Sequence, residues 1–124
     1  MTGRVTSRLE AVVPVRVGGA GGPPMTLPCV LDTGFDGFLA LAPEQFASLG
    51  LRAAGTQVVI LGDGSEARLP VYRVPVHWHG RLLAVPALEV EGAPLLGMAL
   101  LHGSLVSMCV ATDGPVRIDP IPEA

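Results

Sequence analysis

The chain has 124 residues, the size of one domain, and all eight of its basic side chains are arginines spread singly through a sequence of net charge −3. It has no basic stripe, which argues against a nucleic-acid-binding protein. No apolar run has the roughly 20 residues needed to cross a bilayer, and the first ten residues lack the apolar segment of a signal peptide. We therefore expect a cytoplasmic protein with no membrane partner.

The composition favours short strands joined by tight turns, because 49% of the residues are hydrophobic, 16 are glycine and 12 are proline. The first strand is expected over residues 9–19, where Pro14 favours an edge strand or a bulge. A glycine-rich turn over 18–24 leads into a second strand over 25–32, whose most apolar end comes just before Asp32.

A short helix is expected over residues 41–51. Pro43 suits the first helical position, Glu44 lies at the positive end of the helix dipole, and Gly50 suits the C-terminal cap.

The second half of the chain predicts further strands, with tight turns at Asp63-Gly64 and Asp113-Gly114. In chain order we expect a long hairpin over 56–78, a turn at 79–80, a strand over 81–90, an apolar strand and helical turn over 93–103, and a last hairpin over 104–118. The result is one all-β domain over 1–124, with a core from about residue 9 to 119. About eight short strands would form a small closed barrel or a sandwich.

Two cysteines, Cys29 and Cys109, lie in apolar, strand-like stretches. In a reducing cytoplasm we expect two buried free thiols, although the sequence leaves a disulfide open. Their spacing does not suit a metal site.

The run "CVLDTG" places Asp32, Thr33 and Gly34 directly after an apolar strand. A loop aspartate that caps a turn explains this tripeptide by itself. Its context suggests more, because the run "LLG" at 95–97 precedes a second helical turn and a long hairpin with a glycine-flanked tip lies between the two motifs.

The order "LDTG", helix, glycine-tipped hairpin, "PLLGMALL" and closing hairpin resembles the retropepsin-like aspartic proteases, and most of all their bacterial single-domain members. The resemblance extends from about residue 9 to 119. It implies an acid-protease barrel in which the hairpin around "LGDGSE" is a flap over the active site. It also implies peptide-bond hydrolysis without a metal or an organic cofactor.

Hydrolysis by this route needs two carboxylates on either side of one water, one ionised and one protonated. Two carboxylates about 3 Å apart share one proton, as in the known aspartic-protease dyad. The chain has one Asp-Thr-Gly and is too short for two lobes. A second chain must therefore complete the site, in a homodimer with C₂ symmetry.

The resemblance gives each residue a role. Asp32 is the catalytic carboxylate, the Thr33 hydroxyl bonds across the dimer, and the Gly34 amide donates to the aspartate pair. The expected flap and cleft residues are Phe35, Asp36, Leu61, Gly62, Asp63, Gly64 and Leu95, and the expected supports beneath the aspartate loop are Leu96 and Gly97. Each of these residues also has a plain structural explanation as a turn or core residue. The apolar cleft predicts extended peptide substrates with hydrophobic side chains.

The sequence departs from the family at several points. Phe35 replaces the small or hydroxyl residue that usually follows Asp-Thr-Gly, which predicts a less acidic optimum than that of pepsin-like enzymes. Met98 stands where retroviral members have an arginine that pairs with the acid at the position of Asp36. The flap lacks the aromatic residue of pepsin-like flaps.

Other interpretations stay open. One is a retropepsin-like module that binds or dimerises without cleaving, and another is a generic monomeric β-barrel with a structural aspartate turn. His77 and His79 could seat a metal, but they lack a third ligand, and we expect a solvated hairpin end. His102 is expected to end a helix, and no motif makes it the partner of a reactive thiol.

Overall fold

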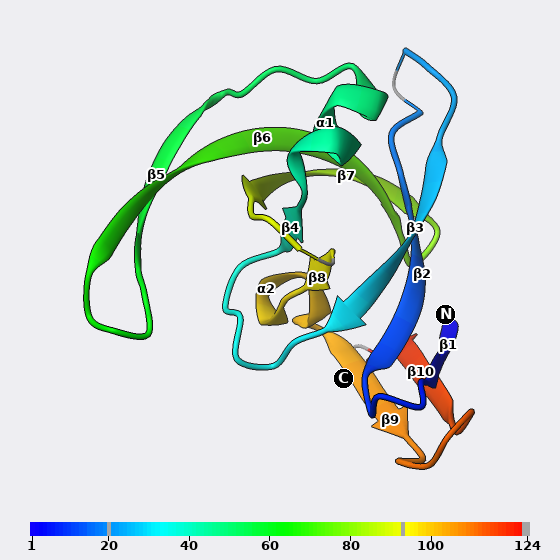
Figure 1. Cartoon of the computed structure of the whole chain (residues 1–124). Helices are drawn as coiled ribbons and strands as arrows, with labels where there is room; N and C mark the ends of the chain where they lie inside the picture. Colours follow the sequence, from blue (N-terminus) through cyan, green and yellow to red (C-terminus); the bar gives the residue numbers. More distant parts are fainter. Residues whose placement is uncertain (20, 93, 123–124) are drawn as a thin grey trace.

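The computed structural model describes residues 1–19, 21–92 and 94–122, which form mainly β-strands (Figure 1). The elements are β1 (Thr2–Val5), β2 (Ala11–Val17), β3 (Met25–Leu31), β4 (Leu39–Leu41), α1 (Pro43–Leu49), β5 (Gly55–Ile60), β6 (Glu66–Trp78), β7 (Arg81–Glu89), β8 (Leu95–Leu96), α2 (Met98–Leu101), β9 (Ser104–Met108) and β10 (Pro115–Pro120). Within these ranges no helix is long and apolar enough to span a membrane.

All of these strands belong to one sheet, in the order β5-β6-β7-β4-β8-β3-β2-β1-β10-β9. An additional antiparallel pairing of β2 with β6, at Arg16–His77 and Val17–Val76, joins strands that are distant in this order. The strands from β6 to β2 therefore form a closed ring. The β5–β6 hairpin curves away from it on one side, and β1, β10 and β9 continue the sheet on the other (Figure 1). The expected all-β fold is confirmed.

The core fills the inside of this ring. Val13, Val15 and Val17 of β2 are fully buried and alternate with exposed Pro14 and Arg16, because successive side chains of a strand point to opposite faces. Facing strands contribute further buried side chains, including Val74, Val76, Leu39, Leu96 and Ile118.

Pro14 does not mark an edge strand, contrary to the expectation. β2 pairs with β3 along its length, and on its other side it pairs with β1 at Ala11 and Val12 and with β6 at Arg16 and Val17. Pro14 lies between these two pairings, at a position where the strand needs no amide donor on that side.

The helix α1 confirms the expectation for this segment, although it is shorter at both ends. Pro43 occupies its first turn, and Gly50 ends it with φ of 69°. The Gln45 side chain accepts a hydrogen bond of 2.8 Å from the amide of Ala42. Phe46 is buried and stacks on Tyr72 of β6 at 3.7 Å, so the helix covers the barrel on this side.

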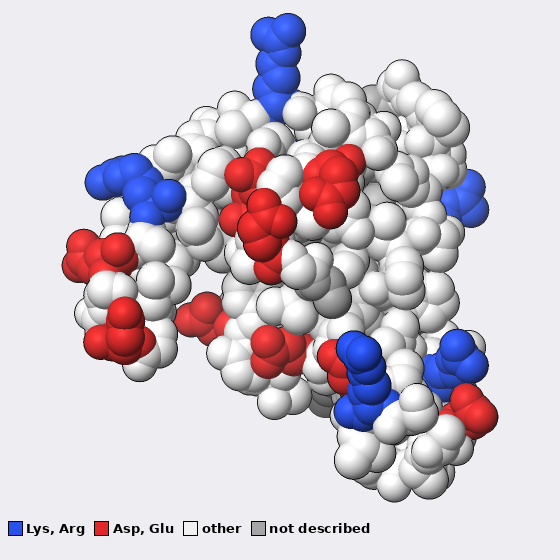
Figure 2. Space-filling model, viewed as in Figure 1, with Lys and Arg blue, Asp and Glu red and all other residues white. Residues whose placement is uncertain are grey.

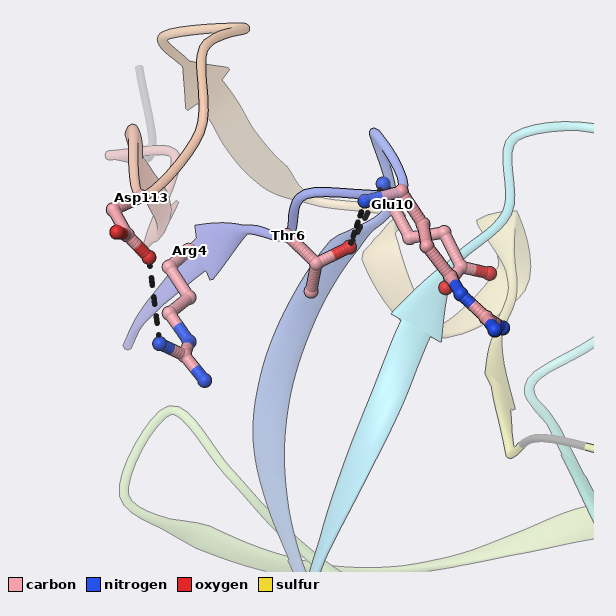
Figure 3. Close-up of polar contacts among 5 residues, drawn as sticks. Arg4, Thr6, Glu10 and Asp113 are labelled. Atoms are coloured by element: carbon pink, nitrogen blue, oxygen red, sulfur yellow. Dashed lines mark hydrogen bonds and ion pairs between the residues drawn. The ribbon is translucent and has the colours of Figure 1, made fainter.

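Strand β1 was not expected and precedes the predicted core. Only Val5 of β1 is buried, so the segment shows no apolar alternation. The turn after β1 is held by Thr6, whose Oγ1 accepts the amides of Arg8 and Glu10 at 3.3 Å each (Figure 3). Arg4 of β1 pairs with Asp113 at 3.4 Å (Figure 3).

Candidate functional site

Asp32 follows the last residue of β3, where β3 pairs in parallel with β8. Its amide donates to the carbonyl of Leu96 at 3.0 Å, so β8 fixes the point at which the chain leaves the sheet. Its Oδ1 accepts the amide of Gly34 at 2.9 Å. The side chain is partly exposed, and its carboxylate is therefore oriented by its own loop and open to a reactant.

The loop that carries Asp32 is docked on the start of α2. The amides of Gly97, Met98 and Ala99 donate to the carbonyls of Phe38, Phe35 and Gly37 at 2.9, 2.8 and 3.0 Å. The first amides of a helix have no partner within the helix, so the loop supplies the acceptors that α2 lacks.

Gly97 and Gly37 let the loop approach α2 this closely. A Cβ on Gly97 would overlap the carbonyl oxygen of Gly37 and would lie 2.6 Å from Cδ2 of the Phe35 ring. A Cβ on Gly37 would lie 2.6 Å from Cε1 of the same ring. Phe35 therefore packs over two glycines. Sequence reasoning gave Gly97 a role but gave none to Gly37, although Gly37 ends the run LDTGF-x-G that resembles the family.

A cleft of about 850 Å³ lies between this loop and the β5–β6 hairpin. Residues 34–40 line one wall and residues 57–61 line the other, with apolar side chains from β6, β7 and β8 between them. Asp36 is the one charged residue among the described residues that line it. Figure 2 shows the hairpin standing away from the body of the molecule, with an open gap between them.

The expected cleft residues divide into two groups. Phe35, Asp36, Leu61 and Leu95 line the cleft, whereas Gly62, Asp63 and Gly64 lie beyond it at the tip of the hairpin. Asp36 is exposed and forms no ion pair with the residues that the structure describes. Met98 stands near this loop but contributes only its backbone amide, and its side chain is 46% exposed.

The tip of the hairpin is a three-residue loop rather than a two-residue turn. The amide of Gly64, which has φ of 85°, donates to the carbonyl of Leu61, and the amide of Leu61 donates to the carbonyl of Ser65. Asp63 accepts the hydroxyl and amide of Ser65, and the hydroxyl bond in particular lowers the pKa of the Asp63 carboxyl.

Strand register brings two other loops to the end of the sheet that carries Asp32. Val30 of β3 pairs with Val12, Ala11 pairs with Val5, and the amide of Val5 donates to Gly114. The β1–β2 turn and the loop between β9 and β10 therefore lie at this end. Each exposes an apolar side chain, Leu9 at 68% and Val110 at 70%, and Leu9 has φ of 61°.

The cysteines differ from the expectation in one respect. Both are free, and Cys29 is buried, which raises the pKa of its thiol to about 12. Cys109 is exposed, because β9 ends at Met108 and the chain turns into a surface loop. Burial therefore keeps Cys29 in the unreactive thiol form.

The histidines of "HWHG" do not share a metal site. His79 lies in the turn after β6 with φ of 49°, which breaks the strand alternation, and its Nε2 is 2.8 Å from the Ser104 hydroxyl. His77 stays on β6, opposite Arg16. No cluster of three metal-binding side chains occurs in the parts of the chain that were placed.

The comparison with solved structures is the informative one. No family model matches the chain, and no curated protein matches it. Among solved structures, a retropepsin-like aspartic protease from Rickettsia conorii superposes with a TM-score of 0.61 over 98% of this chain and 91% of that chain, at 15% sequence identity. At this identity the match shows the fold alone, and the chain therefore has a retropepsin-like fold.

Proposed function

We propose that the chain is an aspartic endopeptidase that is active as a homodimer and hydrolyses peptide bonds with a water held between two Asp32 carboxylates. The observation that carries the proposal is the position of Asp32. Its carboxylate is oriented by Gly34 in a loop docked on α2, next to an apolar cleft under an open hairpin.

The chemistry follows from a pair of carboxylates that share one proton. The ionised Asp32 removes a proton from the water, whose oxygen attacks the carbonyl carbon of the scissile bond. The protonated Asp32 of the other chain donates its proton to the carbonyl oxygen. When the tetrahedral intermediate collapses, the C–N bond breaks and the leaving nitrogen takes the proton of the protonated carboxyl. A hydroxyl of the intermediate gives its proton to the other carboxyl, so that the pair again shares one proton.

A second copy of the chain supplies the other carboxylate, because each chain has one Asp-Thr-Gly. Thr33 is exposed, and its hydroxyl makes no hydrogen bond within the described residues, so it is available to a partner. The exposed Leu9 and Val110 lie on loops at the same end of the sheet and give the second copy apolar surface to cover.

The cleft favours an extended peptide with hydrophobic side chains. Its walls are mainly apolar, and Ile60 and Leu61 of the hairpin are 69% and 45% exposed in the single chain. Closure of the hairpin on a peptide would cover these side chains and exclude water from the reacting bond.

The test compares wild type with Asp32→Asn on a diverse peptide mixture, from about pH 3 to about pH 8 and at high protein concentration. We expect cleavage that is lost in Asp32→Asn and kept in the control Asp119→Asn, whose carboxylate lies on β10 beside Arg117. Cleavage that survives in Asp32→Asn would contradict the proposal. A rate maximum near about pH 2 would contradict the less acidic optimum expected from Phe35.

The second candidate is a retropepsin-like module that binds or dimerises without cleaving. Phe35 favours it, because the ring occupies the groove between Gly37 and Gly97 at the edge of the cleft. No cleavage by wild type, together with a stable dimer in sedimentation, would favour this module, and a stable monomer would favour neither candidate. The cytoplasmic location stays a prediction.

A further inference from the structure

A second, smaller cavity of about 250 Å³ lies on the other side of Phe38 and Ala99 from the cleft, since these two residues line both spaces. Its other walls come from the β6–β7 turn and from α2. The volume suits a ligand of about ten non-hydrogen atoms and is too small for an extended peptide.

The polar side chains of this cavity are all basic. His79, Arg81 and His102 line it, and the described lining residues include no acidic side chain. The two ion pairs found among the described residues, Arg4–Asp113 and Arg117–Asp119, do not involve Arg81. In a chain of net charge −3, this is a local concentration of potential positive charge without an internal counter-ion.

The turn holds the His79 ring in place, whereas Arg81 and His102 are exposed. His79 and Gly80 form the turn with φ of 49° and 76°, Arg81 pairs with Trp78 across it, and the His79 ring is bonded through Nε2 to Ser104. The remaining ring nitrogen of His79 is left for a ligand, as is the fork of the Arg81 guanidinium. His102 ends α2, and its amide donates to Met98.

Apolar walls complete the cavity. The ring of Trp78, which is nearly buried, lies 5.0 Å from the ring of His79, and Phe38, Leu83 and Leu100 are the other large side chains. A ligand therefore meets a flat cationic group and two imidazoles together with aromatic and aliphatic carbon.

From this combination we propose that the cavity binds a small organic oxyanion, a carboxylate or a phosphate monoester attached to a compact apolar group. Arg81 would bind the oxyanion through two parallel N–H bonds, His79 and His102 would add charge-assisted bonds, and Trp78 and Leu100 would contact the apolar group. A divalent cation fits poorly, because Arg81 would repel it. The proposal does not depend on peptidase activity.

The test uses the indole N–H resonance of Trp78, which is the one tryptophan of the chain and therefore a single assignable signal. Benzoate and phenyl phosphate are titrated into the labelled full chain at constant ionic strength, and benzamide serves as the uncharged control. We expect a saturable shift with at least one of the two anions and none with benzamide. The anion that binds more tightly identifies a carboxylate or a phosphate ligand.

Two variants and one matched control assign the effect to the cavity. Arg81→Gln and His102→Gln should each weaken binding roughly tenfold, the usual loss for a hydrogen bond to a charged group. Arg73→Gln, which changes an exposed arginine of β6 outside the cavity, should bind as wild type does. Amide resonances away from the cavity that match those of wild type establish that the free variants fold. No saturable shift with either anion, an equal shift with benzamide, or unaltered binding by both variants would overturn the proposal.

Discussion

Gly97 and Gly37 determine how closely the loop after Asp32 packs on α2. At Gly97, the Phe35 ring and the carbonyl of Gly37 occupy the space that a side chain would need, and at Gly37 the Phe35 ring does. The same contacts hold the segment after Asp32 against α2 through hydrogen bonds, so that Gly34 and the residues after it line the cleft, while Asp32 lies just outside its lining. At the residue scale, two glycines and one ring thus position the carboxylate.

Gly97→Ala should therefore destabilise the fold by roughly 1–3 kcal/mol, the usual cost of overpacking. The matched control is Gly55→Ala, because a Cβ at Gly55 meets nothing within 4 Å. Urea unfolding of both variants checks this. Equal stability of Gly97→Ala and wild type would show that the loop can shift at no cost.

The two cysteines should differ in reactivity. At about pH 8 a thiol reagent should modify Cys109 alone in the folded chain, because burial raises the pKa of the Cys29 thiol to about 12. The folded state then holds the Cys29 proton more tightly than the unfolded state does. This stabilisation is complete below the ordinary thiol pKa, near 9, and is lost as pH rises from there to about 12.

The reactivity is measured by counting modified thiols before and after unfolding. The pH dependence is measured by following the stability of wild type and Cys29→Ala above about pH 9. Modification of two thiols in the folded chain would contradict the first, and an equal alkaline loss of stability in both proteins would contradict the second.

Some residues of the candidate site can be predicted from a short stretch of sequence, and others cannot. Asp32, Thr33 and Gly34 follow an apolar strand, and Gly97 follows an apolar pair, so short stretches indicate them. The close packing of Gly37 and Phe35 depends on α2, which lies about sixty residues further along the chain. The prediction that Cys109 is buried was wrong. Its neighbours in the sequence are apolar, but the strand ends one residue before it.

At the scale of elements, the β5–β6 hairpin is the part of the cleft wall with the least support. Its apolar side chains face the cleft with no cover from the described chain, and its tip is held only by local bonds between Leu61, Asp63 and Ser65. Hairpins of this kind open and close on substrates.

Leu61→Ser should lower kcat/KM for a hydrophobic peptide by about threefold to tenfold, since covering the exposed half of a leucine side chain contributes about 0.7–1.5 kcal/mol. Stability should be unchanged, because the side chain is already half-exposed. Leu82→Ser, at a similarly exposed leucine on β7 outside the cleft, is the matched control. An equal effect of the two substitutions on kcat/KM would exclude a specific role for the hairpin.

The β1–β2 turn makes a separate prediction about assembly. Leu9→Asp should weaken the proposed dimer, because it replaces an exposed apolar side chain with a charged one at the end of the sheet that carries Asp32. Leu82→Asp should leave the dimer intact. Sedimentation across a range of concentrations checks both, and an unaltered Leu9→Asp dimer would place the interface elsewhere.

Elements with strong local signals were predicted well, and those that depend on distant partners were not. The helix α1 carries its own proline, amide and glycine caps. The two hairpins turn near Asp63-Gly64 and Asp113-Gly114 as expected, but through longer loops than two-residue turns, since β9 ends at Met108 and β10 begins at Pro115. Strands β1 and β4 are short and form only against other strands, and Pro14 is tolerated because β2 changes partners there. Pairing partners are set by the whole sheet and leave little local pattern.

At the scale of the whole molecule, the proposed hydrolytic site needs two chains. One chain has one oriented Asp32 carboxylate, one open hairpin and one apolar cleft. We propose that two such chains act together, with one proton shared between their two Asp32 carboxyls.

The most direct test mixes wild-type subunits with Asp32→Asn subunits. The total concentration is fixed and high enough for all subunits to be dimeric. If both carboxylates of a dimer are needed, peptide cleavage falls with the square of the wild-type fraction, to about one quarter in an equal mixture. Asp119→Asn subunits in place of Asp32→Asn should leave the activity unchanged. A decline that is linear in the wild-type fraction, with about one half remaining, would mean that each chain acts alone and would contradict the account.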